Sequence, residues 1–182
     1  MRTAVLTSSR LTLDSISASD AAAVFEYCQD PDIQRYTRVP LPYERNHAEY
    51  FTEVYATEAA SGAALCLWAV RSNSQLVGTA ELRFDSAELG YWIGQPFRGQ
   101  GLMTEALGMI VSHALDPAGF DLERVTWEAV VGNTASATVV QRNGFTFDES
   151  PAYFDLRGQR HDAWRASLHR SDSREPKLGW PL

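Results

Sequence analysis

A strand-like segment of the chain passes into a helical one through two closely spaced glycines. The segment from Gly90 to Thr104 reads GYWIGQPFRGQGLMT, with Gly99 and Gly101 directly before the helical pattern. Glycine lets the backbone approach a ligand closely, and a helix N-terminus offers unpaired N–H groups and the positive end of the helix dipole. This combination is suited to binding a phosphate or a pyrophosphate.

The glycine pair alone is equally compatible with a simple turn between a strand and a helix. The segment lacks the GxxxxGK[ST] pattern of a nucleotide-hydrolysing P-loop and the full GxGxxG pattern of a dinucleotide-binding fold. Neither of those nucleotide-binding classes is therefore indicated.

The wider context of the loop narrows the interpretation. Residues 98–103 (RGQGLM) resemble the acyl-CoA loop, R/Q-x-x-G-x-G/A, of the GCN5-related N-acetyltransferases (GNAT). The preceding AELGYWIG, the following TEAL, and the later NTAS (133–136) and RNGF (142–145) are similar to the branch of ribosomal-protein N-terminal acetyltransferases. The resemblance extends roughly over residues 10–168. Met103 departs from the usual Gly or Ala, and its long side chain either points away from the phosphates or crowds the loop.

The resemblance implies an α+β fold, a single mixed, mostly antiparallel sheet that splays near Gly94 and is flanked by helices. It also implies acetyl-CoA as cosubstrate and no metal. The pantetheine arm would pair with the exposed backbone of one strand, much as an added strand does, and the pyrophosphate would sit on the loop N–H groups. The cofactor-binding residues implied are Trp92, Ile93, Arg98, Gly99, Gln100, Gly101, Leu102, Met103, Thr104, Asn133 and Ser136.

Acyl transfer from a thioester also needs a group that protonates or hydrogen-bonds the leaving thiolate, whose pKa is about 8.5 if it behaves like a cysteine thiol. Relatives commonly use a tyrosine on the short helix after Asn133, and Val140 occupies that position here. Ser136 is the natural substitute, because the helix dipole near its N-terminus favours a developing thiolate. The alternative is a helix-start serine that bonds only locally.

The attacking ammonium must lose a proton, and three carboxylates are candidate bases. Glu88 lies on the strand before the loop, and Asp155 lies about where the ribosomal-protein branch carries a carboxylate. Glu81 on the preceding strand ranks below these two. Each is more often a surface or ion-paired group, and water can also relay the proton.

The elements that must position these residues follow from hydrophobic periodicity and turn signals. Strands are predicted at 10–14, 65–70, 76–84, 88–94, 124–131, 145–147 and 163–168, and helices from Ser19-Asp20 to Asp30-Pro31, at 44–60, at 102–115 and at 134–143. The first helix should bury Val24, Phe25 and Cys28. The second should present Tyr50, Phe51 and Val54 on one face and be followed by Gly62. Val125, Trp127, Ala129 and Val131 should share one side of their strand, with Trp127 in the core.

Length and composition are those of one soluble domain, which we place at residues 1–170, followed by a polar tail at 171–182 that we expect to be loose or an interaction arm. The chain is 45% apolar and 21% charged, with a net charge of −7 that argues against a nucleic-acid partner. No segment approaches the length of a membrane span, and no signal peptide is evident, so a cytoplasmic location is expected. Cys28 and Cys66 lack metal-site spacing and are expected to be buried.

The amine substrate is left open by the sequence. Acetylation of a protein N-terminus is favoured by the branch resemblance, with a small-molecule amine (polyamine, amino acid or amino-sugar antibiotic) as the alternative. A sensor that binds acyl-CoA without transferring the acyl group is a third hypothesis, because the tyrosine is missing. A second copy of the chain is a further candidate partner. The segments Tyr36–Tyr43 and Ser150–Arg160 are expected to wall the substrate entry.

Overall fold

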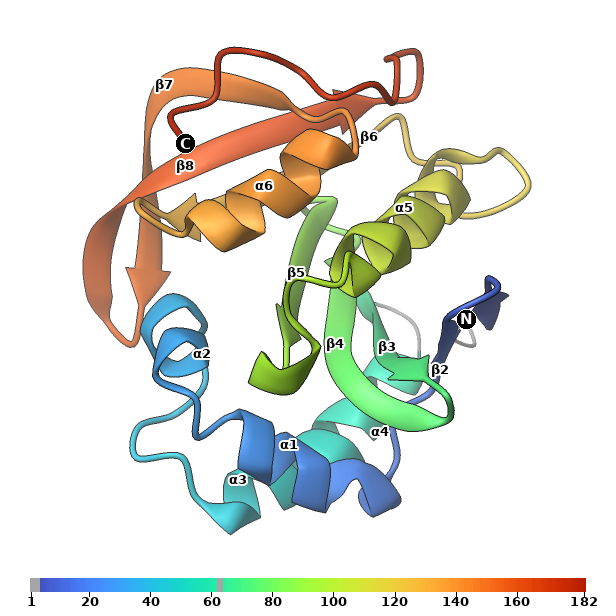
Figure 1. Ribbon diagram of the computed structural model, residues 1–182, viewed down its shortest axis with the longest axis vertical. Helices are drawn as coiled ribbons and strands as arrows, with labels where there is room; N and C mark the ends of the chain where they lie inside the picture. The colour runs from blue at the N-terminus through green and yellow to red at the C-terminus, as the bar shows by residue number, and fades with distance from the viewer. Residues whose placement is uncertain (1–3, 62–63) are drawn as a thin grey trace. The chain divides into compact units, whose positions relative to one another are not determined.

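The computed structural model of the chain describes residues 4–61 and 64–182 (Figure 1). Contacts within the chain divide it into two compact units. The first comprises the described residues up to Phe84 together with Gly90–Leu102, and the second comprises Asp85–Leu89 together with Met103–Leu182. The strand at 88–93 and the start of the helix at 102 therefore each contribute residues to both units.

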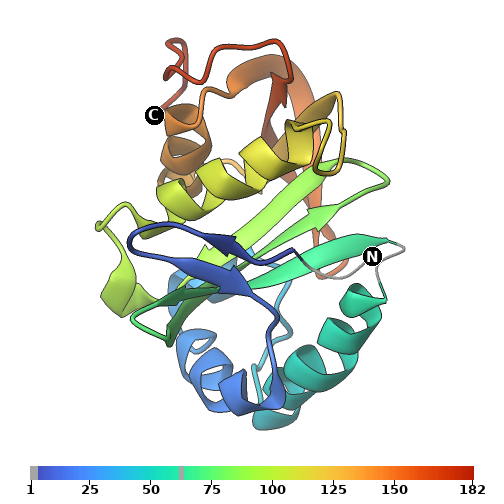
Figure 2. The same ribbon diagram turned by 90° about the vertical axis from the view of Figure 1, so that its right-hand side faces the viewer.

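The first unit packs short helices on one face of antiparallel strands (Figure 2). Its strands are β1 (Leu6–Thr7), β2 (Thr12–Asp14), β3 (Leu65–Ser72) and β4 (Gln75–Arg83), and it holds the C-terminal part of β5 (Glu88–Ile93). Its helices are η1 (Ala18–Asp20), α1 (Ala21–Tyr27), α2 (Pro31–Tyr36), α3 (Arg45–Tyr50), η2 (Phe51–Tyr55), α4 (Ala56–Ala60) and η3 (Gln95–Phe97). Val24 and Cys28 are buried in its core, as predicted, with Phe25 packed against them.

The strands predicted at 65–70 and 76–84 pair as the β3–β4 hairpin, with Asn73 and Ser74 at the turn. Asn73 and Ser74 have φ values of 49° and 64°, the left-handed backbone that a two-residue hairpin turn requires. In contrast, Asp30-Pro31 does not simply end the first helix. The Asp30 carboxylate accepts from the N–H groups of Asp32 and Ile33, and Pro31 takes the first position of α2. Proline stops a helix internally but favours a helix start, so the same dipeptide opens a helix that the sequence analysis missed.

The predicted helix at 44–60 is helical from Arg45 to Ala60, and of the three residues predicted on one face only Phe51 packs against the core. Tyr50 and Val54 are 54% and 44% exposed, and the buried positions are Ala48, Thr52 and Ala59. The middle stretch, η2, is a π-helix, whose wider turn shifts the residues that face the core relative to a regular α-helix. Gly62, expected after this helix, lies outside the described residues.

The second unit is built on β6 (Arg124–Val130), β7 (Thr146–Leu156) and β8 (Gln159–His169), with helices α5 (Leu102–Leu115) and α6 (Thr134–Arg142). Glu88 of β5 pairs in parallel with Thr126 of β6, and β6, β8 and β7 follow as antiparallel neighbours. The strand order is therefore β1-β2-β3-β4-β5-β6-β8-β7. The predicted α+β class with a mixed, mostly antiparallel sheet is confirmed.

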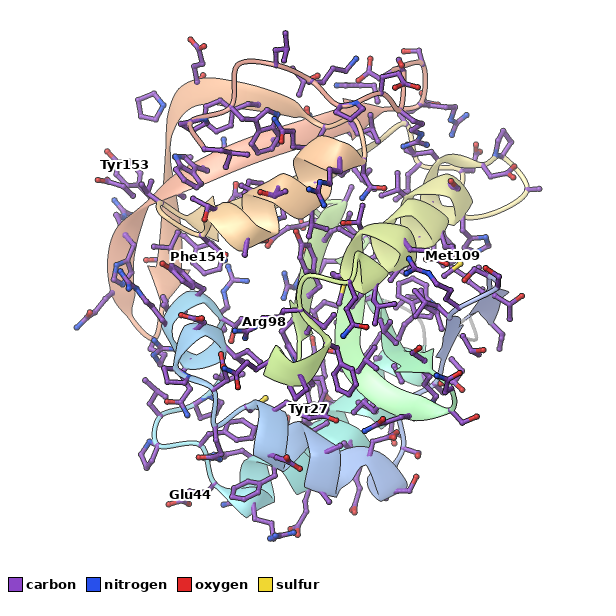
Figure 3. All side chains as sticks on the ribbon, in the orientation of Figure 1. Tyr27, Glu44, Arg98, Met109, Tyr153 and Phe154 are labelled. Carbon is purple, nitrogen blue, oxygen red and sulfur yellow. The ribbon has the colours of Figure 1, made fainter. Side chains whose placement is uncertain are left out.

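The β7–β8 hairpin is much longer than the two short strands predicted at 145–147 and 163–168. Buried Phe154 alternates with exposed Tyr153 and Asp155, and the two strands turn at Arg157 and Gly158 (Figure 3). The segment expected to be a substrate-entry wall is thus mostly strand. Upstream, Val125, Trp127 and Ala129 are buried as predicted, whereas Val131 lies beyond the end of β6 and is 44% exposed.

The C-terminal tail packs on the second unit instead of hanging loose. The Gln141 side-chain amide donates to the carbonyl of Lys177, and Trp180 lies against the rings of Trp127 and Phe147. Polar composition predicted a mobile segment, but one aromatic residue near the end of the chain supplies enough apolar surface to hold it.

Cys28 and Cys66 are free and buried, as predicted. Among residues 4–61 and 64–182, no helix is long and apolar enough to cross a membrane. The same residues contain no cluster of three or more His, Cys, Asp or Glu side chains that could hold a metal ion.

Candidate active site

The loop between η3 and α5 has the backbone geometry that its glycines predict. Gly99 and Gly101 both have φ of +75°, in the left-handed region that favours glycine. A Cβ atom at Gly99 would have no neighbour within 4 Å, and one at Gly101 would meet only Arg10 Nη2, at 3.9 Å. The glycines are therefore required by backbone conformation and leave the surface of the loop open to a ligand.

Side chains of the first unit hold this loop in place. Arg10 Nη1 donates to the carbonyl oxygen of Gln100 over 3.1 Å, and the Gln100 side-chain amide donates to the carbonyl of Pro96 over 3.2 Å. Both bonds occupy carbonyl groups. The N–H groups of the loop, which a phosphate would need, take no part in them.

Arg98, the charged residue of the loop motif, lies beside α2 (Figure 3) and is ion-paired with two aspartates at the start of that helix. Its Nη2 lies 2.7 Å from Asp30 Oδ1, and its Nη1 lies 3.2 Å from Asp32 Oδ2. Burial acts to raise the pKa of Asp30, but the hydrogen bonds from Arg98 and from the N–H groups of Ile33 and Asp32 outweigh it and hold that pKa below its usual value. The Arg98 guanidinium thus anchors the loop to α2.

The start of α5 continues the loop into the second unit. Leu102 and Met103 are 5% and 3% exposed, so the long side chain of Met103 points into the protein, as the open loop requires. The carbonyl of Thr104 accepts a 3.1 Å hydrogen bond from Asn143 Nδ2 at the end of α6. Asn143, from the RNGF segment, therefore ties α6 to the first turn of α5.

Trp92 and Ile93 lie in the first unit, at the end of β5, and both are half-buried. The ring of Trp92 packs edge-on against Tyr27 with a centroid distance of 6.3 Å, and Tyr27 also contacts Phe97 at 5.8 Å. The Tyr27 hydroxyl donates to the carbonyl of Leu76. The strand end that leads into the loop is thus fixed by an aromatic cluster.

Glu81 is the candidate base with the most defined surroundings. Its carboxylate accepts a 2.7 Å hydrogen bond from the Tyr55 hydroxyl and is ion-paired with Arg83. A Cβ atom at Gly90 of β5 would lie 3.0 Å from Glu81 Oε1. Burial, followed by the charge of Glu81, raises the pKa of Tyr55, so this phenol keeps its proton and acts as a donor.

In the second unit, Ser136 stands in the first turn of α6. Asn133 caps the helix by accepting from the Ser136 N–H over 3.2 Å. The indole Nε1 of Trp127 donates to Ser136 Oγ over 3.0 Å. Because an indole N–H can only donate, the serine oxygen accepts in this bond and its own proton is directed elsewhere. Trp127 is core, as predicted, at 1% exposure, and it also contacts the candidate catalytic hydroxyl.

The other candidates of the second unit lie in different surroundings. Glu88 is half-buried and pairs with Thr126, whose side chain faces the side of β6 opposite to Trp127, so Glu88 and Ser136 adjoin opposite faces of that strand. Asp155 is exposed on the side of β7 opposite buried Phe154, and its register partner on β8 is Arg160. Val140, at the position of the missing tyrosine, is fully buried.

The structure thus brings the loop, Trp92, Ile93 and Glu81 into the first unit, and Asn133, Ser136, Glu88 and Asp155 into the second. Sequence reasoning missed Asp30 and Tyr55 as partners of Arg98 and Glu81, and it missed Trp180 as a neighbour of Trp127. Gly90 was a usable signal, because an isolated glycine inside a strand often marks the close approach of another group. The Arg98–Asp30 pair had no local signal, because 68 residues separate the partners.

Comparison with known proteins adds a family to this geometry. The model of the acetyltransferase (GNAT) domain matches residues 10–146. YdaF of Bacillus subtilis, which is named as a ribosomal N-acetyltransferase, is 38% identical to this chain over 84 residues. The match covers 45% of this chain and 44% of YdaF. The ribosomal-protein-serine acetyltransferase of Escherichia coli is 33% identical over 63 residues, which cover 35% of this chain and 34% of that protein. The chain thus matches less than half the length of either relative.

Among solved structures, the fold is similar to RimL, a ribosomal L7/L12 alpha-N-protein acetyltransferase, in complex with coenzyme A. The TM-score is 0.78 at 20% identity, and the match covers 91% of this chain and 98% of RimL. At this identity the similarity establishes the fold.

Proposed function

The chain belongs to the acetyltransferase (GNAT) domain family, and on that premise we propose that it transfers an acetyl group from acetyl-CoA to the N-terminal amine of a protein. The observation that best supports this proposal is the loop at the start of α5. Gly99 and Gly101 both adopt φ of +75° there, and a Cβ atom at Gly99 would have no neighbour within 4 Å. The choice of a protein amine is supported by the names of the two curated relatives, which refer to ribosomal N-acetylation.

The residues present fit acetyl-CoA. The N–H groups from Gly99 to Thr104 would hold the pyrophosphate, because they open a 14-residue helix and the left-handed glycines leave the loop surface uncovered. Arg98 would act through its ion pairs with Asp30 and Asp32, which fix the loop, and through its backbone. The backbone of Trp92 and Ile93 would receive the pantetheine amides as an added strand. When bound, acetyl-CoA supplies the reactive thioester.

The departing thiolate would be stabilised by a hydrogen bond that Ser136 Oγ donates to it. The serine oxygen already accepts a bond from Trp127 Nε1. A hydroxyl that accepts one hydrogen bond becomes a better donor in another, because the two bonds polarise each other. The N-terminal end of α6 adds a positive dipole end that favours developing negative charge. Asn133 would contribute by fixing the first turn of that helix.

The proton of the attacking ammonium would pass to a carboxylate, directly or through water. Glu81 and Glu88 are the two candidates that we favour, because Glu88 belongs to β5, Glu81 lies beside Gly90 of β5, and both are partly shielded from solvent. Glu81 is additionally oriented by the Tyr55 hydroxyl, which stays protonated. Asp155 is the weaker candidate because it is exposed on the outer side of the β7–β8 hairpin.

The proposal includes a cytoplasmic location, which two free, buried cysteines are compatible with. Small-molecule amines and a non-catalytic sensor remain the competing functions. Buried Val140 in place of the tyrosine supports the sensor hypothesis, since no hydroxyl stands at that position.

A panel of amines tests the proposal. Purified protein and acetyl-CoA are incubated with peptides that begin with different residues, with polyamines, with amino acids and with amino sugars, and the products are identified by thiol release and mass spectrometry. We expect peptide α-amines to be acetylated and Gly101→Val to abolish the reaction. Preferential acetylation of a small amine would show that the substrate is a small-molecule amine and not a protein N-terminus. Binding of acetyl-CoA without turnover on any amine would establish the sensor hypothesis instead.

A further inference from the structure

The tail after β8 runs closely over the end of α6. Gly144, which ends the helix with φ of +85°, lies so near the tail that a Cβ there would be 2.7 Å from Arg174 Cα and 2.7 Å from Ser173 O. Further along, Gln141 Nε2 donates to Lys177 O over 3.1 Å. The tail is therefore held to α6 by backbone packing and by a hydrogen bond before it reaches Trp180.

Trp180 ends this path on an aromatic cluster of the second unit. Its ring centroid lies 5.3 Å from that of Phe147 and 5.9 Å from that of Trp127, in tilted arrangements. Its indole N–H is buried and has no hydrogen-bond partner within the described part of the chain. A buried, unsatisfied donor costs about 1–3 kcal/mol. The contribution of Trp180 is thus the packing of its ring on Trp127.

Trp127 links Trp180 to Ser136 on α6. Its indole N–H donates to Ser136 Oγ, so the orientation of the ring sets the direction of the serine hydroxyl. Trp180 lies against one part of the Trp127 ring system, and the β6 backbone fixes the other end of the side chain. A tilt of the ring would lengthen the Nε1–Oγ distance of 3.0 Å and weaken this orienting bond to the hydroxyl.

We propose that the C-terminal tail is a strap that, through Trp180 and Trp127, holds the Ser136 hydroxyl in the direction needed to donate a hydrogen bond to the leaving thiolate. Trp127 and Trp180 are positioning residues, since they act through Ser136. This inference rests on the proposed function, in which Ser136 is the hydrogen-bond donor to the thiolate.

A double-mutant cycle tests the strap. Trp127→Phe removes the indole N–H and keeps an aromatic ring, and we expect kcat to fall about 10-fold with little change in the KM for acetyl-CoA. In the Ser136→Ala background, Trp127→Phe should have no further effect, because the residue it orients is gone. Trp180→Ala should lower kcat several-fold in the parent and leave Ser136→Ala unchanged. Trp180→Phe should keep turnover near that of the parent, since a phenyl ring can pack on Trp127 and the N–H of Trp180 has no partner among residues 4–61 and 64–182.

The same variants are followed by NMR, which separates failure of the strap from failure of the proposed function. The indole N–H resonance of Trp127, assigned among those of the five tryptophans, should shift in Ser136→Ala and in Trp180→Ala and stay near its parent position in Trp180→Phe. An unmoved Trp127 resonance in Trp180→Ala, or kinetic effects that multiply with Ser136→Ala, would overturn the strap. An inactive parent that still shows the coupled resonances would overturn the acetyltransferase proposal and leave the physical link between tail and Ser136 standing.

Discussion

The loop of the first unit and the serine of the second are built in different ways. The loop from Arg98 to Leu102 owes its form to backbone: two glycines at φ of +75° and a helix start. Ser136 owes its orientation to side chains, because Trp127 bonds its oxygen and Trp180 packs on Trp127. The form of the loop is determined by five consecutive residues. The orientation of Ser136 depends on Trp127, 9 positions before it, and on Trp180, 44 positions after it.

This difference decides what each part can tolerate. A backbone site fails when a residue cannot adopt the required φ, and few other changes harm it. A hydroxyl oriented by neighbours fails when any member of the chain of contacts moves. We therefore expect mutations at the loop to be severe but local to it, and mutations around Ser136 to be graded and coupled to one another.

The largest effect is expected at Gly101. Gly101→Val forces a β-branched residue to φ of +75° and places a side chain over the loop N–H groups, so we expect acetyl-CoA affinity to fall more than about 100-fold. Isothermal titration calorimetry measures it. Gly158→Val is the matched control, because Gly158 has φ of +77° and equally open surroundings in the β7–β8 turn. It should carry the same backbone strain and keep its affinity. Equal losses in both variants would show strain alone and remove the loop assignment.

Ser136→Ala should have the next largest effect. If Ser136 donates to the thiolate, the interaction exists mainly in the transition state, and kcat should fall about 10- to 100-fold, equivalent to about 1.4–2.7 kcal/mol. Acetyl-CoA affinity should change little. Thr138→Ala in the same helix is the control, because its hydroxyl donates to the carbonyl of Thr134 in the preceding turn. Unchanged turnover of Ser136→Ala on the best amine would take the serine out of the mechanism.

The loop and the main strands could be predicted from the sequence because their signals are local. The glycine pair, the hairpin turn at Asn73-Ser74 and the apolar spacing of α5 each lie within a few residues. The packing of the tail could not be predicted from the sequence. It depends on contacts of Trp180 with the rings of Trp127 and Phe147, which β6 and β7 place beside it. The shared face predicted for the helix at 44–60 differs from the observed one for another reason. The π-helical stretch η2 changes the helical periodicity, and no residue type in the sequence signals it.

A moderate, pH-dependent effect is expected at Asp30, which links the loop to α2. Asp30→Asn removes the charge paired with Arg98 and should cost about 1–3 kcal/mol of unfolding free energy near neutral pH. The pKa of Asp30 is depressed in the folded state, so its contribution is fully present above the unfolded pKa of about 4 and is lost as the pH falls through the folded value. The difference in Tm between parent and variant should therefore shrink on acidification.

Asp32→Asn is the control for Asp30, because it meets the same guanidinium at 3.2 Å with a side chain that is 66% exposed. Its effect on Tm should be small at every pH, since exposed ion pairs contribute little. A Tm difference for Asp30→Asn that grows as the pH falls would contradict the assigned direction. Equal effects of the two substitutions would show that the cap and the loop are not coupled through Asp30.

The smallest effect is expected at Asp155, which tests whether the outer side of the β7–β8 hairpin takes part in the chemistry. Asp155 is exposed and alternates with buried Phe154 and Leu156, so we expect Asp155→Asn to change kcat less than about twofold. Glu81→Gln and Glu88→Gln are measured beside it across the same pH range. Loss of a general base removes the acidic limb of the pH–rate profile, and that loss should appear in one of the two glutamate variants. If the limb vanishes in Asp155→Asn instead, the hairpin carries the base. The residues of the second unit that take part in the chemistry would then include one on β7, and Glu81 would be a structural partner of Tyr55 and Arg83.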